Sequence, residues 1–476
     1  MRPIGKSKIK LTDIKGLIMR NQFTFGVGAM LFCLGAFGQK KVQPSPPNIL
    51  LFLADDCTFR DLGCYGSKDA KTPNIDKFAK EGMQFTRCFQ AAPMCSPTRS
   101  SLYTGIYPVK TGAYPNHTFV KDGTLSIVQH LAPAGYTTAL LGKTHINPKS
   151  AFPFDYLGDP GDELDFQKMD QFLDQTTQKK QPFCLFVCSH QPHGPYTQGD
   201  PSKFDPKKVV LPPYYVDTKE TRGQFVKYLA EITYMDNEFA KSLALLKKYG
   251  VSENTVVVFA SEQGNGLPFA KFTCYGNGLQ SGFLVRWPGK IIPGKVSNAM
   301  IEYVDVAPTF IEIAGLKVPE TIEGESFLDV LTGKKEDHKS FVYGIQTTRG
   351  IIDGSEYYGI RTIRSKTHRY ILNLTPEATF QNGTTTSSLF KSWIAKAAND
   401  TLAKKLVDKY QHRPAEELYD VVMDPLEMNN LADSPPLASI KKELREKLLK
   451  WMEQQGDRGQ QTEMEALDHQ TKNRKE

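Results

Sequence analysis

The strongest constraint on the fold of this chain is a set of four short apolar runs, each followed at once by polar side chains. Such continuous runs have the length and composition of parallel strands that are buried on both faces of a sheet. Helical patterns lie between them, and that alternation is typical of an α/β fold. The runs are residues 48–53, 136–141, 183–188 and 256–259.

The side chains that follow these runs are suited to holding ions and moving protons. Asp55 and Asp56, after the first run, repel each other unless a cation lies between them; a solvated turn is the alternative. In open α/β sheets, ligands bind beyond the carboxyl ends of the strands, so the four ends can meet at one site. The polar side chains after the other runs include Lys143, His145, His190, His193, Glu262 and Gln263.

Residues 93–105 form a fifth stretch of interest. Pro97 suits the first helical position after a Ser96 cap, and Gly105 suits the end of the helix. Cys95 then lies just ahead of a helix N-terminus, where free N–H groups and the helix dipole favour an anion. Arg99, about one turn on, can point its guanidinium at the same place. A buried structural cysteine is the alternative interpretation.

The cysteine stretch resembles a known motif. Cys95-x-Pro97-x-Arg99, continued by Leu102-Tyr103-Thr104-Gly105, is similar to the pattern by which sulfatases mark a cysteine for oxidation to formylglycine. From about residue 48 to 452 the chain resembles the formylglycine-dependent sulfatases of the alkaline phosphatase superfamily. The resemblance also rests on Asp55-Asp56, Thr72-Pro73-Asn74-Ile75-Asp76, Gly142-Lys143-x-His145, Pro192-His193-x-Pro195, Trp287-Pro288-Gly289 and Glu417-Leu418-Tyr419-Asp420.

The resemblance implies one calcium ion as cofactor. The family usually has Asp-Asn or Asp-His after the fourth strand, whereas this chain has Glu262-Gln263, which keeps the oxygen donors and adds a methylene to each. The tolerant coordination of calcium fits that change better than the strict octahedron of magnesium. A degenerate homologue without metal is the alternative. The implied ligands are Asp55, Asp56, modified Cys95, Glu262 and Gln263.

The chemistry implied by the resemblance is hydrolysis of a sulfate ester or an N-sulfate. A maturation enzyme would convert Cys95 to formylglycine, which hydrates to a diol with one hydroxyl to attack sulfur and another to expel the product. His145 would take a proton from the diol, and His193 would protonate the leaving atom. In the same scheme Arg99 orients the diol, and Lys143 and Lys271 hold the sulfate oxygens.

The substrate class rests on a finer likeness to the heparan sulfamidase branch. Its signs are His190-x-Pro192-His193, Gly266-Leu267-Pro268-Phe269 and the spacing of Ser261, Lys271 and Tyr275; that branch has Arg where this chain has Lys271. A terminal glucosamine of heparin or heparan sulfate is favoured, N-sulfated first and 6-O-sulfated second. Arg349 would bind a second anion on the sugar with its planar guanidinium. A structural arginine paired with an acid is the alternative.

Three other functions stay open on the sequence. One is an O-sulfatase for another sulfated glycan, the second is a phosphatase or phosphonate hydrolase of the same superfamily, and the third is a catalytically dead glycan-binding protein.

A zinc protease is excluded. The histidines His190 and His193 lie among prolines, which forbid the helix that a zinc protease would need.

The first 38 residues have the pattern of a secretory signal peptide. Six basic side chains precede an apolar run, residues 23–37, that is too short to span a bilayer, and Ala36-Phe37-Gly38 resembles a cleavage site. This segment carries +5 of the formal net charge of +7, so the charge of the remaining chain indicates no nucleic-acid partner. We therefore expect export, to the periplasm or beyond, and no transmembrane segment.

The rest of the chain predicts two domains. Residues 39–340 are expected to form the catalytic domain, with a mostly parallel central sheet flanked by helices. A helix over residues 222–249 should pack on this sheet without a catalytic role. Shorter mixed runs predict a smaller antiparallel α+β subdomain over residues 341–455, and residues 456–476 are expected to be a frayed polar tail. Nothing in the sequence indicates an oligomeric state.

Overall fold

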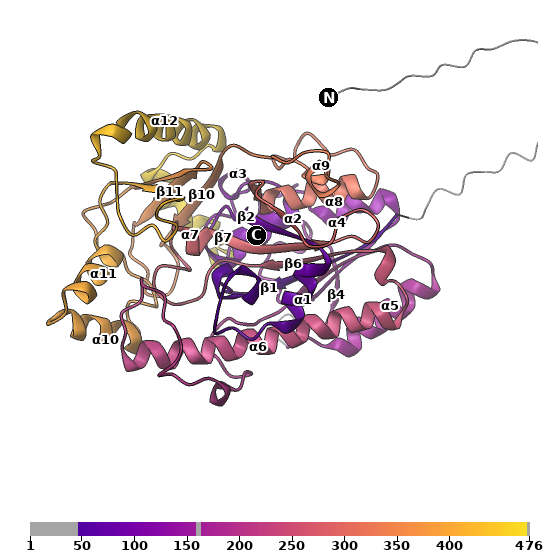
Figure 1. Ribbon diagram of the computed structural model, residues 1–476. Helices are drawn as coiled ribbons and strands as arrows, with labels where there is room; N and C mark the ends of the chain where they lie inside the picture. The colour runs from indigo at the N-terminus through magenta and orange to yellow at the C-terminus, as the bar shows by residue number, and fades with distance from the viewer. Residues whose placement is uncertain (1–45, 159–162, 474–476) are drawn as a thin grey trace, which may run out of the picture. The chain divides into compact units, whose positions relative to one another are not determined.

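The computed structural model describes residues 46–158 and 163–473 (Figure 1). The predicted signal peptide lies outside the described residues. Two sheets, one of nine strands and one of four, organise the described part of the chain. The predicted α/β class, with a second antiparallel sheet after it, is confirmed.

The large sheet is built around β1 (Asn48–Ala54). It lies between β5 (Phe183–Cys188) and β6 (Thr255–Ser261), parallel to both, and β3 (Thr137–Gly142) is parallel to β5. The four apolar runs of the sequence are therefore four neighbouring parallel strands. β7 (Gln280–Arg286) is antiparallel to both of its neighbours, β6 and β2. The other strands are β2 (Met83–Phe89), β4 (Asp155–Leu157), β8 (Lys295–Ser297) and β9 (Ile301–Glu302).

Helices cover both faces of this sheet, which explains why its strands are apolar on both sides. In β1, Leu50 and Phe52 belong to one hydrophobic cluster, and Ile49 and Leu51 belong to the other, because successive strand residues point to opposite faces. Figure 1 shows the two helical layers. The first cluster includes residues of α1 (Pro73–Glu81), α5 (Phe166–Gln178) and α6 (Lys219–Lys248); the second includes residues of α2 (Cys95–Thr104), α4 (Ile127–Leu131), α8 (Val306–Ile313) and α9 (Leu328–Leu331).

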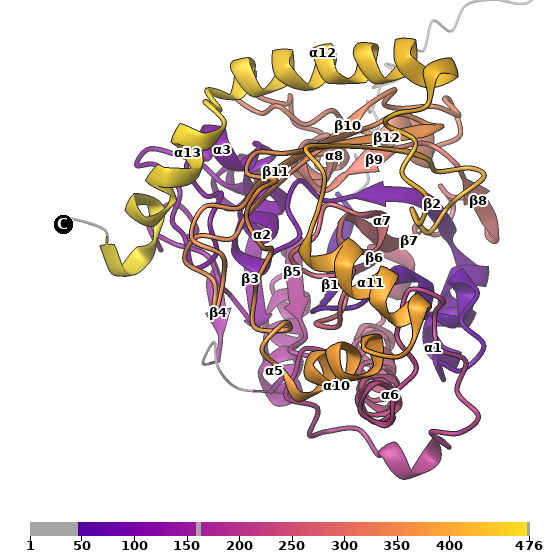
Figure 2. The same cartoon turned by 90° about the vertical axis from the view of Figure 1, so that its left-hand side faces the viewer.

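The small sheet is antiparallel throughout and carries α12 (Ala438–Gln455) on one face (Figure 2). Trp451 of α12 stacks on Tyr343 with ring centroids 4.8 Å apart. The strands are β10 (Val342–Thr347), β11 (Gly359–Arg364), β12 (His368–Asn373) and β13 (Glu416–Asp420).

Two further helices, α10 (Ser388–Ala397) and α11 (Thr401–Gln411), join the small sheet to α6. The buried indole of Trp393 donates a hydrogen bond to the Thr221 hydroxyl of α6 at 2.7 Å. The remaining short helices are α3 (Pro108–Thr111), α7 (Gly276–Leu279) and α13 (Gln460–Met464). Nowhere in the described ranges is a helix both long enough and apolar enough to cross a bilayer.

The last described residues differ from the frayed tail that the sequence predicts. α13 and the turn Glu465–His469 pack beside α3 (Figure 2), and the Tyr114 hydroxyl donates to the carbonyl of Thr462 at 2.8 Å. Gln470 is 2% exposed. The segment is held mainly by hydrogen bonds to neighbouring loops, which a reading of apolar patterns does not detect.

A buried ion pair fastens the small sheet to the large one. Arg369 of β12 donates to the Glu427 carboxylate at 2.6 Å and to the carbonyl of Cys274 at 3.2 Å. The same carboxylate accepts from the backbone N–H of Gly276 at 2.6 Å. Because Arg369 and Glu427 are 1% and 2% exposed at their side chains, neither charge has water as a substitute partner.

Removing the arginine tests this joint. Arg369→Met should lower the free energy of unfolding by about 3–5 kcal/mol, because it leaves the Glu427 carboxylate buried and uncompensated. Arg445→Met is the matched control: Arg445 is half exposed and pairs with Glu416 at 3.4 Å, so its loss should cost under about 1 kcal/mol. Urea unfolding measures both, and equal small losses would contradict the role of the buried pair.

Candidate active site

The site lies where the four parallel strands end. Register places Ala54 of β1 beside Ser261 of β6, and Leu53 of β1 and Gly142 of β3 both beside Cys188 of β5. The polar residues that follow these strands therefore begin at the same edge of the sheet, as the sequence predicts.

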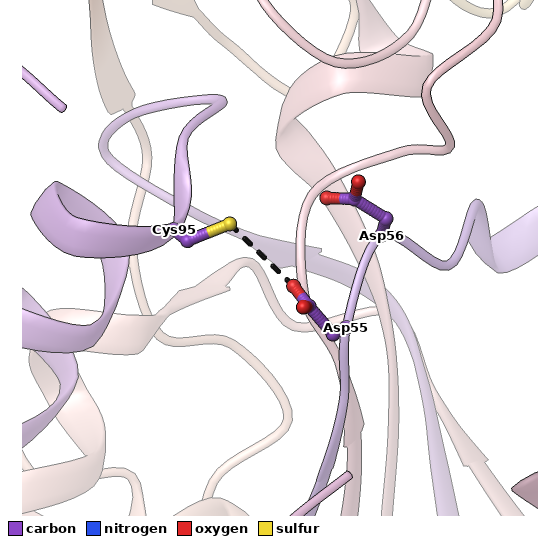
Figure 3. A group of neighbouring side chains, drawn as sticks. All are labelled: Asp55, Asp56 and Cys95. Atoms are coloured by element: carbon purple, nitrogen blue, oxygen red, sulfur yellow. Dashed lines mark hydrogen bonds between the residues drawn. The ribbon is translucent and has the colours of Figure 1, made fainter. Parts of the chain in front are cut away.

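Asp55 and Asp56 form the floor of the site. Their exposed fractions are 0% and 3%, so two neighbouring carboxylates are almost fully withdrawn from water. Asp56 has a φ of 54°, in the left-handed region that only short polar residues and glycine adopt readily. Ligand atoms of Asp55, Asp56 and Cys95 lie within 4.8 Å of one another (Figure 3).

Cys95 is the first residue of α2, and Met94 is the extended residue before it. The helix thus begins two residues earlier than the Ser96 cap and Pro97 start that the sequence predicts. The Cys95 sulfur lies 3.5 Å from the Asp55 carboxylate and 2.9 Å from the side-chain amide nitrogen of Gln263. Burial, with the Asp55 charge, raises the pKa of the Cys95 thiol to about 12. The thiol is therefore protonated at neutral pH, and a protonated thiol is a weak nucleophile.

Two lysines supply the charge that the carboxylates need. The Lys143 ammonium contacts Asp55, and the Lys271 ammonium donates to Asp56 at 2.8 Å; each nitrogen lies 3.7 Å from the Cys95 sulfur. Burial by itself would raise the pKa of Asp55, but Lys143 foremost, with His193 and Arg99, holds that pKa well below its usual range. Although burial favours a neutral amine, the Asp56 carboxylate raises the pKa of Lys271.

Arg99 connects α2 to the ends of β3 and β6. Its guanidinium donates to both oxygens of Glu262, at 3.0 and 2.7 Å, and to the carbonyl of Lys143 at 2.8 Å. Both charged side chains are fully buried. Burial raises the pKa of Glu262, and the Arg99 charge opposes that rise. Arg99 makes its principal contact with Glu262, and its guanidinium lies 3.9 Å from the carboxylate of Asp55.

The donor set fits a hard cation. Asp55 and Asp56 offer carboxylate oxygens, and the side-chain oxygen of Gln263 is buried with no hydrogen-bond partner among the described residues. Its amide nitrogen donates to Asp56 at 2.8 Å, and a half-turn of the amide would bring the unpartnered oxygen toward that carboxylate. A buried acceptor beside two carboxylates is satisfied by a cation and not by a further acceptor. Each Glu262 oxygen keeps a second lone pair beyond its bond to Arg99.

The two predicted acid–base histidines have different surroundings. His193 is 39% exposed at its side chain, with its Nε2 3.5 Å from Asp56 and its Nδ1 2.5 Å from the carbonyl of Gly194. The His145 Nε2 lies 3.0 Å from the Nδ1 of His117, and its own Nδ1 is buried without a partner in the described ranges. Burial foremost, and then the Lys143 charge, lowers the pKa of His145 to about 2.

Part of this site lines a cavity of about 890 Å³, whereas Asp55, Arg99, Glu262 and Gln263 are not among its lining residues. The predicted residues Asp56, Cys95, Lys143, His145, His193 and Lys271 all face it. Arg349 is not among the lining residues; its guanidinium lies over the Tyr357 ring at 5.0 Å, while the neighbouring Ile351 and Ile352 do line the cavity. The lining residues also include Gln224, Lys227, Thr384, Ser387 and Ser388.

Sequence reasoning assigned no catalytic or anion-binding role to several of the lining residues, among them Lys227 and His117. Lys227 lies on α6, which the sequence assigned to packing alone, and an exposed lysine on an amphipathic helix carries no signal of a ligand. His117 lies in a loop that belongs to no periodic pattern, so only the tertiary structure brings it to His145.

The comparison with protein families shows which family this chain belongs to. The family model described as Sulfatase matches residues 47–316, more than half of the chain. The chain belongs to the sulfatase family. A second model, described as N-sulphoglucosamine sulphohydrolase, C-terminal, matches residues 264–381 of this sulfatase.

Individual relatives agree with this assignment. An ulvan-active sulfatase of Formosa agariphila is 36% identical over 419 residues, covering 86% of this sulfatase and 81% of the relative. The human N-sulphoglucosamine sulphohydrolase is 28% identical over 481 residues, covering 89% and 92%. A solved structure in complex with its substrate D-glucosamine-2-N,6-O-disulfate shares the fold, with a TM-score of 0.64 at 19% identity over 87% of this chain and 99% of that one.

The low pKa of His145 predicts a pH dependence of stability for this sulfatase. The unfolded chain binds a proton at His145 below pH ~6.5, whereas the folded chain does not, so this residue makes stability fall as the pH falls. Between pH 7 and pH 5, wild-type protein should lose about 1–2 kcal/mol more of its free energy of unfolding than His145→Gln. Urea unfolding at both values measures the difference.

The control for this comparison is His412→Gln, at an exposed histidine. It should keep the wild-type dependence on pH. The same loss of stability in wild type and His145→Gln would show that His145 is not held neutral by its surroundings.

Proposed function

We propose that this sulfatase removes sulfate from a sulfated saccharide by means of a hydrated formylglycine made from Cys95 and one bound calcium ion. The observation that carries the proposal is the position of Cys95. It lies at the start of α2, with the Asp55 carboxylate on one side and two lysine ammoniums 3.7 Å from its sulfur. These surroundings suit an anionic group, and the modified side chain of Cys95 would be the group that attacks it.

The unmodified thiol is a poor candidate for the attacking group. Burial and the Asp55 carboxylate keep it protonated, since its pKa is about 12. Formylglycine, when present, supplies a diol hydroxyl as the nucleophile. A maturation enzyme that acts on Cys95-x-Pro97-x-Arg99 is then a required partner, and it would have to act before folding, because Cys95 is 1% exposed in the folded chain.

Calcium is the cation that best suits the oxygen donors. Asp55, Asp56, the turned amide of Gln263, Glu262 and the modified Cys95 would hold it. Bound there, it would polarise the sulfate and lower the pKa of the attacking hydroxyl. The longer Glu262-Gln263 pair suits calcium, whose coordination tolerates irregular geometry, better than magnesium.

The protein's own side chains have distinct roles in this proposal. Lys143 and Lys271 bind the sulfate oxygens as charged donors, and each can exchange its carboxylate partner for the substrate once a cation neutralises Asp55 and Asp56. His193, which is accessible from the cavity, protonates the leaving oxygen or nitrogen. His145, neutral at physiological pH, is free to accept a proton.

A glucosamine sulfate of the heparin or heparan type is the favoured substrate. It is supported by the match to the C-terminal model described as N-sulphoglucosamine sulphohydrolase and by the 28% identity to the human protein of that name. The 36% identical relative is named for ulvan, so another sulfated glycan is the second candidate. A cavity of about 890 Å³ is within the range that holds a small saccharide.

A two-metal phosphatase would need a second set of ligands. The described part of the chain contains a single group of three or more His, Cys, Asp or Glu side chains that could hold a metal. Its members are Asp55, Asp56 and Cys95. Enzymes that use two metals to transfer phosphate place them about 3.5–4 Å apart, each with its own ligands. The donor set therefore favours one cation and a sulfate monoanion.

The predicted export of this sulfatase is part of the proposal. It rests on the basic and apolar pattern of residues 1–38, which lie outside the described ranges. Purification from the periplasm or the medium, with a new N-terminus after Gly38, would support it.

Release of sulfate tests the proposed reaction. Protein co-produced with a maturation enzyme should give a Cys95 peptide lighter than the thiol form by the difference between CH₂SH and CHO, and it should hydrolyse aryl sulfate faster than aryl phosphate. Cys95→Ser should lose at least ~1,000-fold in kcat, because the second hydroxyl is missing. Faster cleavage of phosphate, or full activity with an unmodified thiol, would contradict the proposal.

A second test concerns the positively charged side chain that would face the sugar. Lys227 lines the cavity and forms no ion pair within the described residues, so it is placed to bind a second anion on the saccharide. Lys227→Met should raise KM about tenfold for a disulfated saccharide, and little for a monosulfated aryl substrate. Lys219→Met, on the same helix and exposed, should change neither.

Arg349→Met distinguishes the two candidates for this contact. Arg349 is the candidate that the sequence favours, and Lys227 is the one that lines the cavity. A selective rise in KM from Arg349→Met, with none from Lys227→Met, would assign the second anion to the arginine.

A further inference from the structure

His117 and His145 form a pair inside the cavity. The Nδ1 of His117 lies 3.0 Å from the Nε2 of His145, and the rings meet edge to face with centroids 4.7 Å apart. Both line the cavity that holds Cys95. From the sequence, the loop of residues 111–117 is expected to help select the substrate, and no role in proton transfer is assigned to His117.

The surroundings of His145 create a problem for a residue that accepts protons. Its ring is partly buried, and the charges of Lys143 and Arg99 lie close by. An imidazolium in that place is repelled by both cations, and Asp55 is the carboxylate that offsets them. A proton taken up at the buried Nδ1 must therefore leave quickly through the other nitrogen, and the group at that nitrogen is His117.

His117 is placed to pass the proton on. It is exposed at the mouth of the cavity, whereas His145 is partly buried beneath it. Burial of part of the ring, followed by the charges of Lys143, Lys271 and Lys472, lowers the pKa of His117, so it is neutral at rest and releases a proton readily to water.

The C-terminal segment holds His117 in this position. The Thr471 backbone N–H donates to the carbonyl of His117 at 2.9 Å, and the Gln470 side chain donates to the carbonyl of Asn116 at 2.9 Å. Thr118 and Gln470 form an antiparallel bridge. His117 itself has a φ of 54°, a conformation that costs about 1–3 kcal/mol and persists where surrounding contacts impose it.

We propose that His117 relays the proton that His145 accepts during turnover. At rest the Nε2–H of His145 donates to the Nδ1 of His117. When the Nδ1 of His145 takes up a proton, the Nε2 proton moves to the Nδ1 of His117, and His117 gives its Nε2 proton to water. One proton enters at His145 and one leaves at His117, and the reverse transfer, in which His117 takes a proton from water, restores the starting tautomers. The relay rests on the proposed sulfatase reaction, and the segment up to Thr471 keeps it aligned.

The experiment uses the full-length, formylglycine-containing enzyme with calcium and an aryl sulfate. His117→Ala should lower kcat about tenfold to a hundredfold with little change in KM, because proton removal and not binding is slowed. Added imidazole should restore a large part of kcat to His117→Ala, since it can occupy the vacated space at the cavity mouth. His117→Gln keeps a hydrogen-bonding side chain but cannot relay, so it should be slow and should resist rescue.

Two controls separate the relay from a structural role. His412→Ala, at an exposed histidine away from the cavity, should match wild type with and without imidazole. Gln470→Ala should lower kcat with an unchanged KM, because it releases the loop that carries His117. Full activity of His117→Gln, or a loss in His117→Ala that imidazole does not repair while the melting temperature stays at the wild-type value, would overturn the relay.

The proposed function is tested separately by the wild-type enzyme in the same assay. Absence of sulfate release from converted wild type would contradict the sulfatase reaction itself. Release by wild type, with unchanged kcat in both His117 variants, would contradict the relay alone.

Discussion

The structure depends on the enclosure of two adjacent carboxylates at the end of its central strand. Asp55 and Asp56 are almost fully buried, and the isolated charges would cost several kcal/mol each. Lys143 and Lys271, from two different loops, offset that charge, and Arg99 balances Glu262 beside them. A cation between the carboxylates would free both ammoniums for an anionic substrate. The same electrostatic requirement thus accounts for the fold of the strand ends and for the proposed chemistry.

The scaffold meets this requirement with rigid elements. Charged groups follow directly from β1, β3 and β6, which are neighbours or next neighbours in the parallel part of the large sheet, and Arg99 lies on a helix packed against that sheet. Loops supply Lys271 and His193. The small sheet, joined through Arg369 and Glu427, closes the cavity from the other side with residues such as Ile352 and Thr384.

Much of this arrangement could be predicted from the sequence. A buried parallel strand has an apolar pattern on both faces, so β1, β3, β5 and β6 and their polar ends were evident, and the cysteine motif indicated the family.

The contacts of His117 and Lys227 could not be predicted, because each depends on segments far apart in the chain that meet only after folding. The packed segment up to residue 473 escaped prediction for a related reason: polar side chains such as Gln470 hold it through backbone carbonyls of distant loops. Arg349 fitted the chemistry of an anion-binding residue, but side-chain type alone does not tell whether a residue faces the cavity.

The most direct test of this account is a calorimetric titration of calcium into the formylglycine-containing protein. We predict one ion per chain, and an affinity at least ~10-fold weaker in Asp56→Asn and in Gln263→Leu, because each removes an oxygen donor from the buried set. Asp205→Asn, at an exposed carboxylate, should bind as wild type does. Failure to bind calcium, or binding that is unchanged in both site variants, would contradict the claim that the buried carboxylates are built around a cation.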